Sequence, residues 1–465
     1  MKQEQKGISR SDRAKRRLSK HLEQINLYAA GIDVGSEMHY VAVPEGLDEN
    51  PVRAFSCFTG DLEHLADWLV KIGVQTVVME STGVYWIPVF EILEERGLRV
   101  RLVDARRVKH VAGRKTDVLD CQWLQQLHTY GLLEGAFRPP EQVCALRAYL
   151  RQRDTLVRQM ATHVQHMQKA LRQMNLLLDN VISDITGATG MKIIRAIVDG
   201  EREPLRLAKY RDPRCKSSEA CIVKSLQGHY RDEHLFALRQ AIELYDIFQE
   251  KIRACDGAIE RHLETFAPKA DPADLPQANR RKKKQGNAAR FDVRAYLYRM
   301  SGVDMTRIEG IDESIALKVI SEIGIDMSRW KTEKHFASWL GLSPGSKISG
   351  GKVLSSRTKR TANRAAAALR MAAFAVSNSK SAVGAYYRRL RARLGAPKAI
   401  TATAHKLARI LYNMLKHTTD YVDQGQDSYE RQYRERALKN IRRRAAEFGY
   451  SLVQNATEEL AALNT

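Results

Sequence analysis

The chain has 465 residues, more than one hydrophobic core usually organises, so two or three domains are expected. Hydrophobic residues make up 44% of it, yet no apolar run approaches the roughly 20 residues that cross a bilayer, and the N-terminal stretch is charged throughout. These features favour a cytoplasmic protein over a secreted or membrane protein, and the net charge of +22 (76 Lys+Arg against 54 Asp+Glu) indicates a polyanionic partner such as nucleic acid.

Shifts in composition divide the chain into six segments. We expect a basic tail over 1–27, an α/β domain over 28–140, a helical or coiled-coil region over 141–270, a basic linker over 271–300, a mainly α-helical domain over 301–420 and a helical tail over 421–465. The six cysteines show neither CxxC nor Cys/His spacing, so neither a zinc site nor a disulfide framework is expected.

Strand and helix patterns alternate from Tyr28 to about Leu133. The apolar run YAAGIDV, the turn GSEMH and the run YVAVP predict a β-hairpin that opens a sheet. A helical pattern DLEHLADWLVKIG follows, and then a buried strand QTVVME, a helix VYWIPVFEILEERG and a strand LRVRLVD. This alternation predicts an α/β domain.

Two acidic residues stand at the ends of predicted strands. Asp33 ends the first strand beside Gly35, and Glu80 ends the buried strand QTVVME. Ligands of α/β sheets bind at the carboxyl ends of strands, so both carboxylates are expected to face one crevice. Each acid alone has a structural alternative, a turn residue for Asp33 and a strand-end charge for Glu80.

The segment RKTDVLDCQWLQQL adds two further acids. Asp117 and Asp120 are three residues apart, which on a helix places them on one face, although a helix N-terminus also favours acids through its dipole. Phosphodiester chemistry needs such a cluster, because two Mg²⁺ ions, with Mn²⁺ as a substitute, activate the attacking oxygen and stabilise the leaving one. Arg114 and Lys115 are expected near the substrate phosphates.

Beyond Pro140 long polar helices with heptad-like apolar spacing are predicted. They comprise ALRAYLRQRDTLVRQMATHVQHMQKALRQM and LFALRQAIELYDIFQEKIRACDGAIERHLETF, with short helices between Asn180 and about Ser225. Antiparallel helices, a coiled coil and an ordinary bundle all fit this pattern. The linker that follows carries a basic run, expected to contact phosphates rather than only solvent, that consists of Arg280, Arg281, Lys282, Lys283 and Lys284.

A third, mainly helical region begins near Arg307. Its first part, IEGIDESIALKVISEIG, is similar to a helix-hairpin-helix unit, in which backbone amides at a helix start meet a phosphate. The tail from Asp423 to Thr465 has the pattern of an amphipathic helix with charged faces and offers no chemistry.

The motifs GIDVGS, VVMESTGVYW and RKTDVLD resemble the N-terminal domain of DEDD-type insertion-sequence transposases. That domain is similar to the RuvC Holliday-junction resolvase, which implies an RNase H-like fold in which the DEDD acids hold Mg²⁺. The run FASWLGLSPGSKISGGKVLSSRTKRTANRAAAALRMAA resembles the C-terminal transposase domain of the same family. Together these two stretches cover about residues 28 to 175 and 300 to 417.

The resemblance implies a serine nucleophile beside a glycine pair. Alignment on GLSP and SGGK places it at Ser349, with Ser346 in reserve. Gly350 and Gly351 leave room for a phosphate, and positive charge near the serine is expected from Lys352, Lys359 and Arg360. In the family the acids and their Mg²⁺ ions activate the serine, which then forms a covalent phosphoserine intermediate. A phosphate-binding loop without a nucleophile is the alternative.

The family also implies the partners. Its members work with a structured non-coding RNA whose loops pair with donor and target DNA, so that base pairing reads the sequence while the protein holds the backbones. Joining two DNA sites suggests a homodimer or homotetramer, and the protein would be associated with the bacterial nucleoid when it acts.

Three other classes of function remain open on sequence grounds. A structure-selective endonuclease for DNA junctions would use the same acids with water as nucleophile and would not need Ser349. GIDVGS also resembles the phosphate loop of actin-like sugar kinases, but no convincing second phosphate loop or adenosine site follows it. A non-catalytic nucleic-acid-binding protein would explain the charge, but clustered carboxylates would then repel phosphate unless metal intervened.

Overall fold

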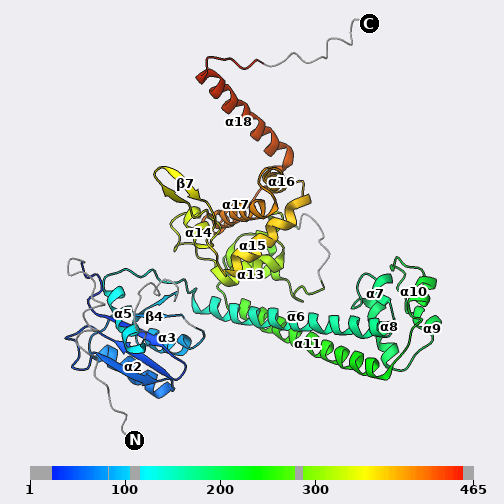
Figure 1. The fold of residues 1–465 in the computed structure, drawn as a ribbon, viewed down its shortest axis with the longest axis horizontal. Helices are drawn as coiled ribbons and strands as arrows, with labels where there is room; N and C mark the ends of the chain where they lie inside the picture. Colours follow the sequence, from blue (N-terminus) through cyan, green and yellow to red (C-terminus); the bar gives the residue numbers. More distant parts are fainter. Residues whose placement is uncertain (1–22, 82, 105–115, 278–285, 454–465) are drawn as a thin grey trace. The chain divides into compact units, whose positions relative to one another are not determined.

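The computed structural model describes residues 23–81, 83–104, 116–277 and 286–453. The chain forms two compact units, unit 1 over 1–138 and unit 2 over 139–465 (Figure 1). An α/β N-terminal unit followed by a helical remainder was predicted, and this division is confirmed. No helix within the described ranges is both long enough and apolar enough to span a membrane.

Unit 1 is built on a mixed sheet of five strands in the order β3-β2-β1-β4-β5. Strand β1 pairs antiparallel with β2 and parallel with β4, and β4 pairs parallel with β5. The elements described in this unit are β1 (Ala29–Val34), β2 (Met38–Ala42), β3 (Val52–Ser56), α2 (Thr59–Lys71), β4 (Thr76–Glu80), α3 (Trp86–Glu95), β5 (Arg99–Val103) and α5 (Asp117–Thr129). The predicted opening hairpin is therefore confirmed, whereas the edge strand β3 was not foreseen.

The two faces of the sheet carry different helices. Ile32 and Met79 lie in the core with Leu65 of α2 and Phe90 of α3. On the other face, a smaller apolar cluster joins Val78 and its neighbours to α5. Side chains alternate between faces along a strand, so the residues next to Ile32 and Met79 face the α5 side.

The described residues of unit 2 form helices and one two-stranded ribbon. Its elements are α6 (Glu141–Gln173), α7 (Leu178–Val181), α8 (Ala188–Val198), α9 (Pro204–Ala208), α10 (Glu219–Ser225), α11 (Asp232–Glu264), η1 (Pro272–Asp274), α12 (Val293–Ser301), η2 (Met305–Arg307), α13 (Glu313–Ile323), α14 (Glu333–Trp339), β6 (Lys347–Ser349), β7 (Lys352–Ser355), α15 (Arg364–Ala375), η3 (Val376–Asn378), α16 (Ala382–Leu394), α17 (Ala396–His417) and α18 (Gly425–Glu447).

Helices α6 and α11, each of 33 residues, run antiparallel to one another. The side-chain amide of Gln142 donates to Thr265, and further along the pair Arg153 Nε lies 2.5 Å from Asp256 Oδ1. This ion pair is almost fully buried, and Arg153 also donates to the carbonyl of Asn287 at 3.0 Å. Antiparallel long helices were one of the predicted arrangements, and the short helices α7 to α10 between them are also confirmed.

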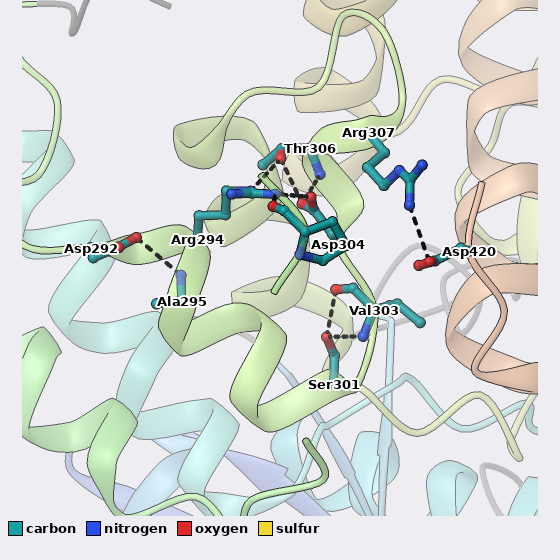
Figure 2. Close-up of polar contacts among 10 residues, drawn as sticks. Asp292, Arg294, Ala295, Ser301, Val303, Asp304, Thr306, Arg307 and Asp420 are labelled. Carbon is teal, nitrogen blue, oxygen red and sulfur yellow. Dashed lines mark hydrogen bonds and ion pairs between the residues drawn. The ribbon is translucent and has the colours of Figure 1, made fainter. Parts of the chain in front are cut away.

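A second buried ion pair organises the start of the C-terminal helical region (Figure 2). Arg294 of α12 donates to Asp304 at 2.5 Å and to the carbonyl of Pro276, while Asp304 also accepts from Thr306. Farther along, Arg307 pairs with Asp420 at 3.1 Å, which ties the turn before α13 to the segment after α17 (Figure 2).

The turn before α13 is packed into the interior. A Cβ on Gly310 would lie 2.5 Å from Val376 Cγ1 and 2.6 Å from the carbonyl oxygen of Ala372. The carboxylate of Asp312 accepts from the amide of Ile315 and so caps the helix. These contacts give the start of α13 a packing role, and the similarity to a helix-hairpin-helix unit stays a prediction.

Candidate active site

Asp33 and Glu80 lie side by side at the carboxyl ends of two parallel strands. The register pairs Ala29 with Thr76 and continues to Ile32 with Met79, so the next step along both strands brings Asp33 level with Glu80. Both side chains face the side of the sheet that α5 covers, because their predecessors point into the opposite core. Both are half-buried. The predicted meeting of these two carboxylates at one sheet edge is therefore supported by the strand register.

Helix α5 crosses this face with its N-terminus toward the same edge. At the middle of β1, a Cβ on Gly31 would lie 2.4 Å from the amide nitrogen of Gln125 and 2.6 Å from the carbonyl oxygen of Cys121. At the start of β4, His128 Nε2 lies 3.0 Å from Thr76 Oγ1. Because later helix residues meet earlier strand residues, the first turn of α5 lies toward the strand ends.

That first turn carries Asp117 and Asp120. The hydroxyl of Thr116 caps the helix by accepting from the amide of Leu119 at 3.3 Å. Asp117 is exposed and Asp120 is half-buried. The helix therefore delivers two acids to the edge at which Asp33 and Glu80 lie. We call Asp33, Glu80, Asp117 and Asp120 the acid edge.

The pKa of the buried Cys121 thiol indicates how close these carboxylates lie to it. Burial raises the pKa of Cys121 well above its usual value, and the negative charges of Asp33 and, more weakly, Asp120 raise it further. Since electrostatic influence fades with distance, carboxylates from β1 and from α5 must both lie near one sulfur atom. Cys121 stays a neutral thiol beneath the acid edge and is not a nucleophile.

The residues that could bind a metal ion are thus oxygen donors only. The four acids share one edge, but within the described ranges no three histidine, cysteine, aspartate or glutamate side chains, those of the acid edge included, lie close enough together to hold a metal ion. Arg114 and Lys115, predicted to contact phosphates beside the acid edge, lie outside the described residues. The same holds for the linker run, which comprises Arg280, Arg281, Lys282, Lys283 and Lys284.

Ser349 is the last residue of β6 and lies directly before a tight turn. It pairs with Lys352 across the ribbon, and Gly350 and Gly351 between them have φ values of 54° and 74°. Positive φ at both central residues defines the type I′ turn, which glycine adopts without strain. No atom lies within 4 Å of where either glycine would carry a Cβ. The glycine pair therefore fixes the turn and leaves the tip open around an exposed Ser349.

The ribbon extends well beyond the turn. Gly345 donates to the carbonyl of Arg357 at 2.9 Å, and Pro344 bridges to Thr358. We call residues 344–358 the serine ribbon. Its sides are unusually apolar for exposed strands, with Ile348 at 63%, Val353 at 62% and Leu354 at 69% exposure.

Of the three cations predicted near Ser349, only one lies beside it on the ribbon. Lys352 is its direct cross-strand neighbour, but Lys359 and Arg360 follow the base of the ribbon, about 16 Å away along a strand of five residues. Ser346, the reserve candidate, also precedes β6 near the base. Lys347 lies two residues before Ser349 on β6, where the register shifts between Lys347 and Ile348, and it is a neighbouring cation that sequence reasoning missed. Its closeness to Ser349 in the sequence was the available signal.

The acid edge belongs to unit 1 and Ser349 to unit 2. Comparison with known families matches both. Residues 30–176, which include the whole acid edge, match a transposase model of the DEDD type named for IS110. Residues 304–388, which include Ser349, match a model described as transposase of the IS116/IS110/IS902 family. No curated protein matches the chain.

An α/β unit with acids at its strand ends, followed by a second matched domain that carries an exposed serine, defines an enzyme of DNA rearrangement, an insertion-sequence transposase. Within that class, the two models that match are named for IS110 and for the IS116/IS110/IS902 family. Neither match includes residues 177–303 or 389–465, which hold the short helices α7 to α10 and the terminal helix α18.

Proposed function

We propose that this transposase cuts and rejoins DNA through a covalent link to Ser349, and that unit 1 is an RNase H-like domain whose acid edge holds Mg²⁺. The observation that carries the proposal is the convergence at one sheet edge. The strand register sets Asp33 beside Glu80, and the direction of α5 brings Asp117 and Asp120 to the same place.

The chemistry of the donors fits Mg²⁺. Carboxylate oxygens are the hard ligands that this ion prefers, and the acid edge offers four carboxylates, while the thiol of Cys121 remains protonated. Asp33, Glu80, Asp117 and Asp120 would hold two ions, with Mn²⁺ as a substitute. Ions bound there would offset the charge of a phosphodiester and stabilise the leaving oxygen.

The role of Ser349 is that of a nucleophile. Its hydroxyl oxygen forms a bond to the phosphorus of the cut strand, and its proton passes to a water molecule. The bond from phosphorus to one bridging oxygen breaks, and that oxygen takes up a proton to become a free sugar hydroxyl. Attack by another sugar hydroxyl on the phosphoserine reverses these steps and joins the new strand. The exposed position of Ser349 beside a tight turn suits this exchange.

Lys347 and Lys352 would position the phosphate at the tip of the serine ribbon, because both flank Ser349. The wider surplus of positive charge suits donor and target DNA and, in addition, a structured non-coding guide RNA that reads the target by base pairing. Sequencing the RNA that copurifies with the expressed chain tests whether the protein binds such a guide RNA.

Two DNA sites must be held at once, so we propose a homodimer or homotetramer.

Trapping the covalent protein–DNA intermediate tests whether Ser349 is the nucleophile. Purified protein with its copurified RNA, Mg²⁺ and duplex DNA should form a protein–DNA adduct that survives denaturing electrophoresis. Ser349→Ala should abolish both the adduct and recombination. The variant should still unfold at the wild-type temperature, because the Ser349 side chain is exposed.

Ser346→Ala is the matched control, since it removes the same hydroxyl from the same ribbon and should leave the adduct intact. DNA cleavage by Ser349→Ala without any adduct would instead indicate a junction endonuclease that uses water. Normal recombination by Ser349→Ala would refute the serine mechanism.

A further inference from the structure

Among the described residues, the contacts that hold the terminal helix α18 lie at its start. Its amide at Gln426 donates to the carbonyl of Lys380, and the side chain of Gln426 accepts from Arg388 at 2.7 Å. Tyr433 then stacks on the Arg389 guanidinium at 3.3 Å, and Tyr429 lies against Lys406 of α17 at 5.1 Å. These contacts fix the first nine residues of α18 to α16 and α17.

Beyond Tyr433 the helix continues without burying any residue. From Arg434 to Glu447 every residue is exposed except Ala437 and Ala445, which are half-buried. An isolated helical stretch of this length is marginal in water, because helices shorter than about 12–15 residues gain little without packing. A helix that is polar on most sides either crosses solvent toward a partner, is held by side-chain pairs of its own, or is unstable. We call residues 434–444 the basic arm.

Charge identifies the partner of the basic arm. Its 11 residues contain six cations, Arg434, Arg436, Lys439, Arg442, Arg443 and Arg444, against one acid, Glu435, so six minus one gives a net charge of +5. Two copies of so basic a helix would repel one another. Five of the six cations are arginines, whose planar forks match phosphate oxygens better than lysine does.

The arrangement of the cations favours duplex DNA. At about 100° per residue, Arg442 and Arg444 lie about 160° apart, on opposite sides of the helix. A helix in the major groove has phosphates along both of its flanks, and the groove of duplex DNA is wide enough to admit an α-helix. Cations on two sides therefore suit a duplex better than a single flat surface.

We propose that the basic arm of α18 is a sequence-independent contact for the phosphate backbone of duplex DNA. The tyrosine anchor at the start of the helix fixes the direction in which the arm leaves α16. This inference rests on the proposed function only in taking DNA as the substrate, and it does not depend on Ser349 or on metal.

The test measures DNA affinity of the full chain against salt. Wild type and the triple variant Arg442→Gln, Arg443→Gln, Arg444→Gln are titrated with a duplex of random sequence. Losing three phosphate contacts should make the slope of log affinity against log salt less negative by about 2.7. Between 50 and 200 mM salt, wild-type affinity should therefore fall about 40-fold more than that of the variant.

The control removes the same charge elsewhere. Arg206→Gln, Arg214→Gln, Arg231→Gln changes three exposed arginines among the short helices of unit 2, and it should leave the salt slope near that of wild type. An equal loss in both triple variants would mean that bulk charge alone acts, and would overturn the proposal. So would an unchanged slope in the arm variant, or a loss confined to RNA binding or to self-association.

Ser349→Ala distinguishes this inference from the proposed function. That variant should bind duplex DNA as wild type does, although it forms no adduct. If it recombines DNA normally, the serine mechanism is refuted. The DNA contact of the basic arm is still tested separately, by the salt titration of the arm variant.

Discussion

Replacing Gly31 by alanine should displace the helix that carries half of the acid edge. The added Cβ would lie 2.4 Å from the amide nitrogen of Gln125 and 2.6 Å from the carbonyl oxygen of Cys121, both backbone atoms of α5. Ordinary contacts need about 3.5 Å, so the helix has to move by about 1 Å relative to β1. Overpacking of this kind costs about 1–3 kcal/mol.

Two readouts follow from that displacement. A loss of about 1–3 kcal/mol in a unit of this size lowers the unfolding temperature by roughly 3–10 °C. A misplacement of about 1 Å at a catalytic group lowers the rate on the order of 100-fold. At a temperature where the variant is fully folded, its rate of adduct formation should therefore be lower than that of wild type by that factor. Calorimetry and a timed adduct assay on the same preparation measure both.

Gly60→Ala provides the matched control. No atom lies within 4 Å of where its Cβ would stand, at the second residue of α2. This change should raise stability by up to about 1 kcal/mol and leave the rate unchanged. If Gly31→Ala matches Gly60→Ala in both stability and rate, α5 does not pack against β1 as described, and the account of the acid edge is wrong.

Two further predictions concern buried titratable groups. Burial, aided by the nearby charge of Arg101, lowers the pKa of His128 from its ordinary value of 6.5 to about 4. The neutral imidazole therefore contributes its full stability above pH 6.5, and this contribution, about 3 kcal/mol at the limit, is lost as the pH falls toward 4. His128→Gln should flatten denaturant-measured stability against pH in that window, and an unchanged pH dependence would count against the buried neutral imidazole. Arg153→Ala should cost unit 2 about 3–5 kcal/mol, because it leaves Asp256 buried without its partner, whereas Arg153→Leu with Asp256→Leu should restore most of that stability. Equal losses in the single and double variants, measured by urea unfolding, would show that the pair itself matters little.

Sequence reasoning succeeded where local pattern decides the outcome. The apolar runs that end in Asp33 and Glu80 are buried strands, and helical periodicity placed Asp117 and Asp120 on one turn. The direction in which α5 crosses the sheet was beyond such reasoning, because it depends on the close approach that Gly31 permits to a helix some 90 residues later in the chain.

Two elements were missed for different reasons. Strand β3 is a short edge strand with little burial, so its sequence VRAFS carries no clear alternation. The serine ribbon did have a local signal, since two glycines between Ile348-Ser349 and Lys352-Val353 are typical of a type I′ hairpin. The length of the ribbon could not be foreseen from that signal, and the role of Lys359 and Arg360 beside Ser349 stays a prediction.

Peptide mapping of the trapped adduct tests the central claim most directly. Trypsin cuts after Lys347 and Lys352, so the peptide between them is Ile348-Ser349-Gly350-Gly351-Lys352, with one hydroxyl residue, while Ser346 falls in the preceding peptide. After nuclease digestion of the DNA, mass spectrometry should find a nucleotide remnant on this five-residue peptide. A remnant on the Ser346 peptide, or wild-type recombination with no modified peptide at all, would contradict the assignment of Ser349 as the nucleophile.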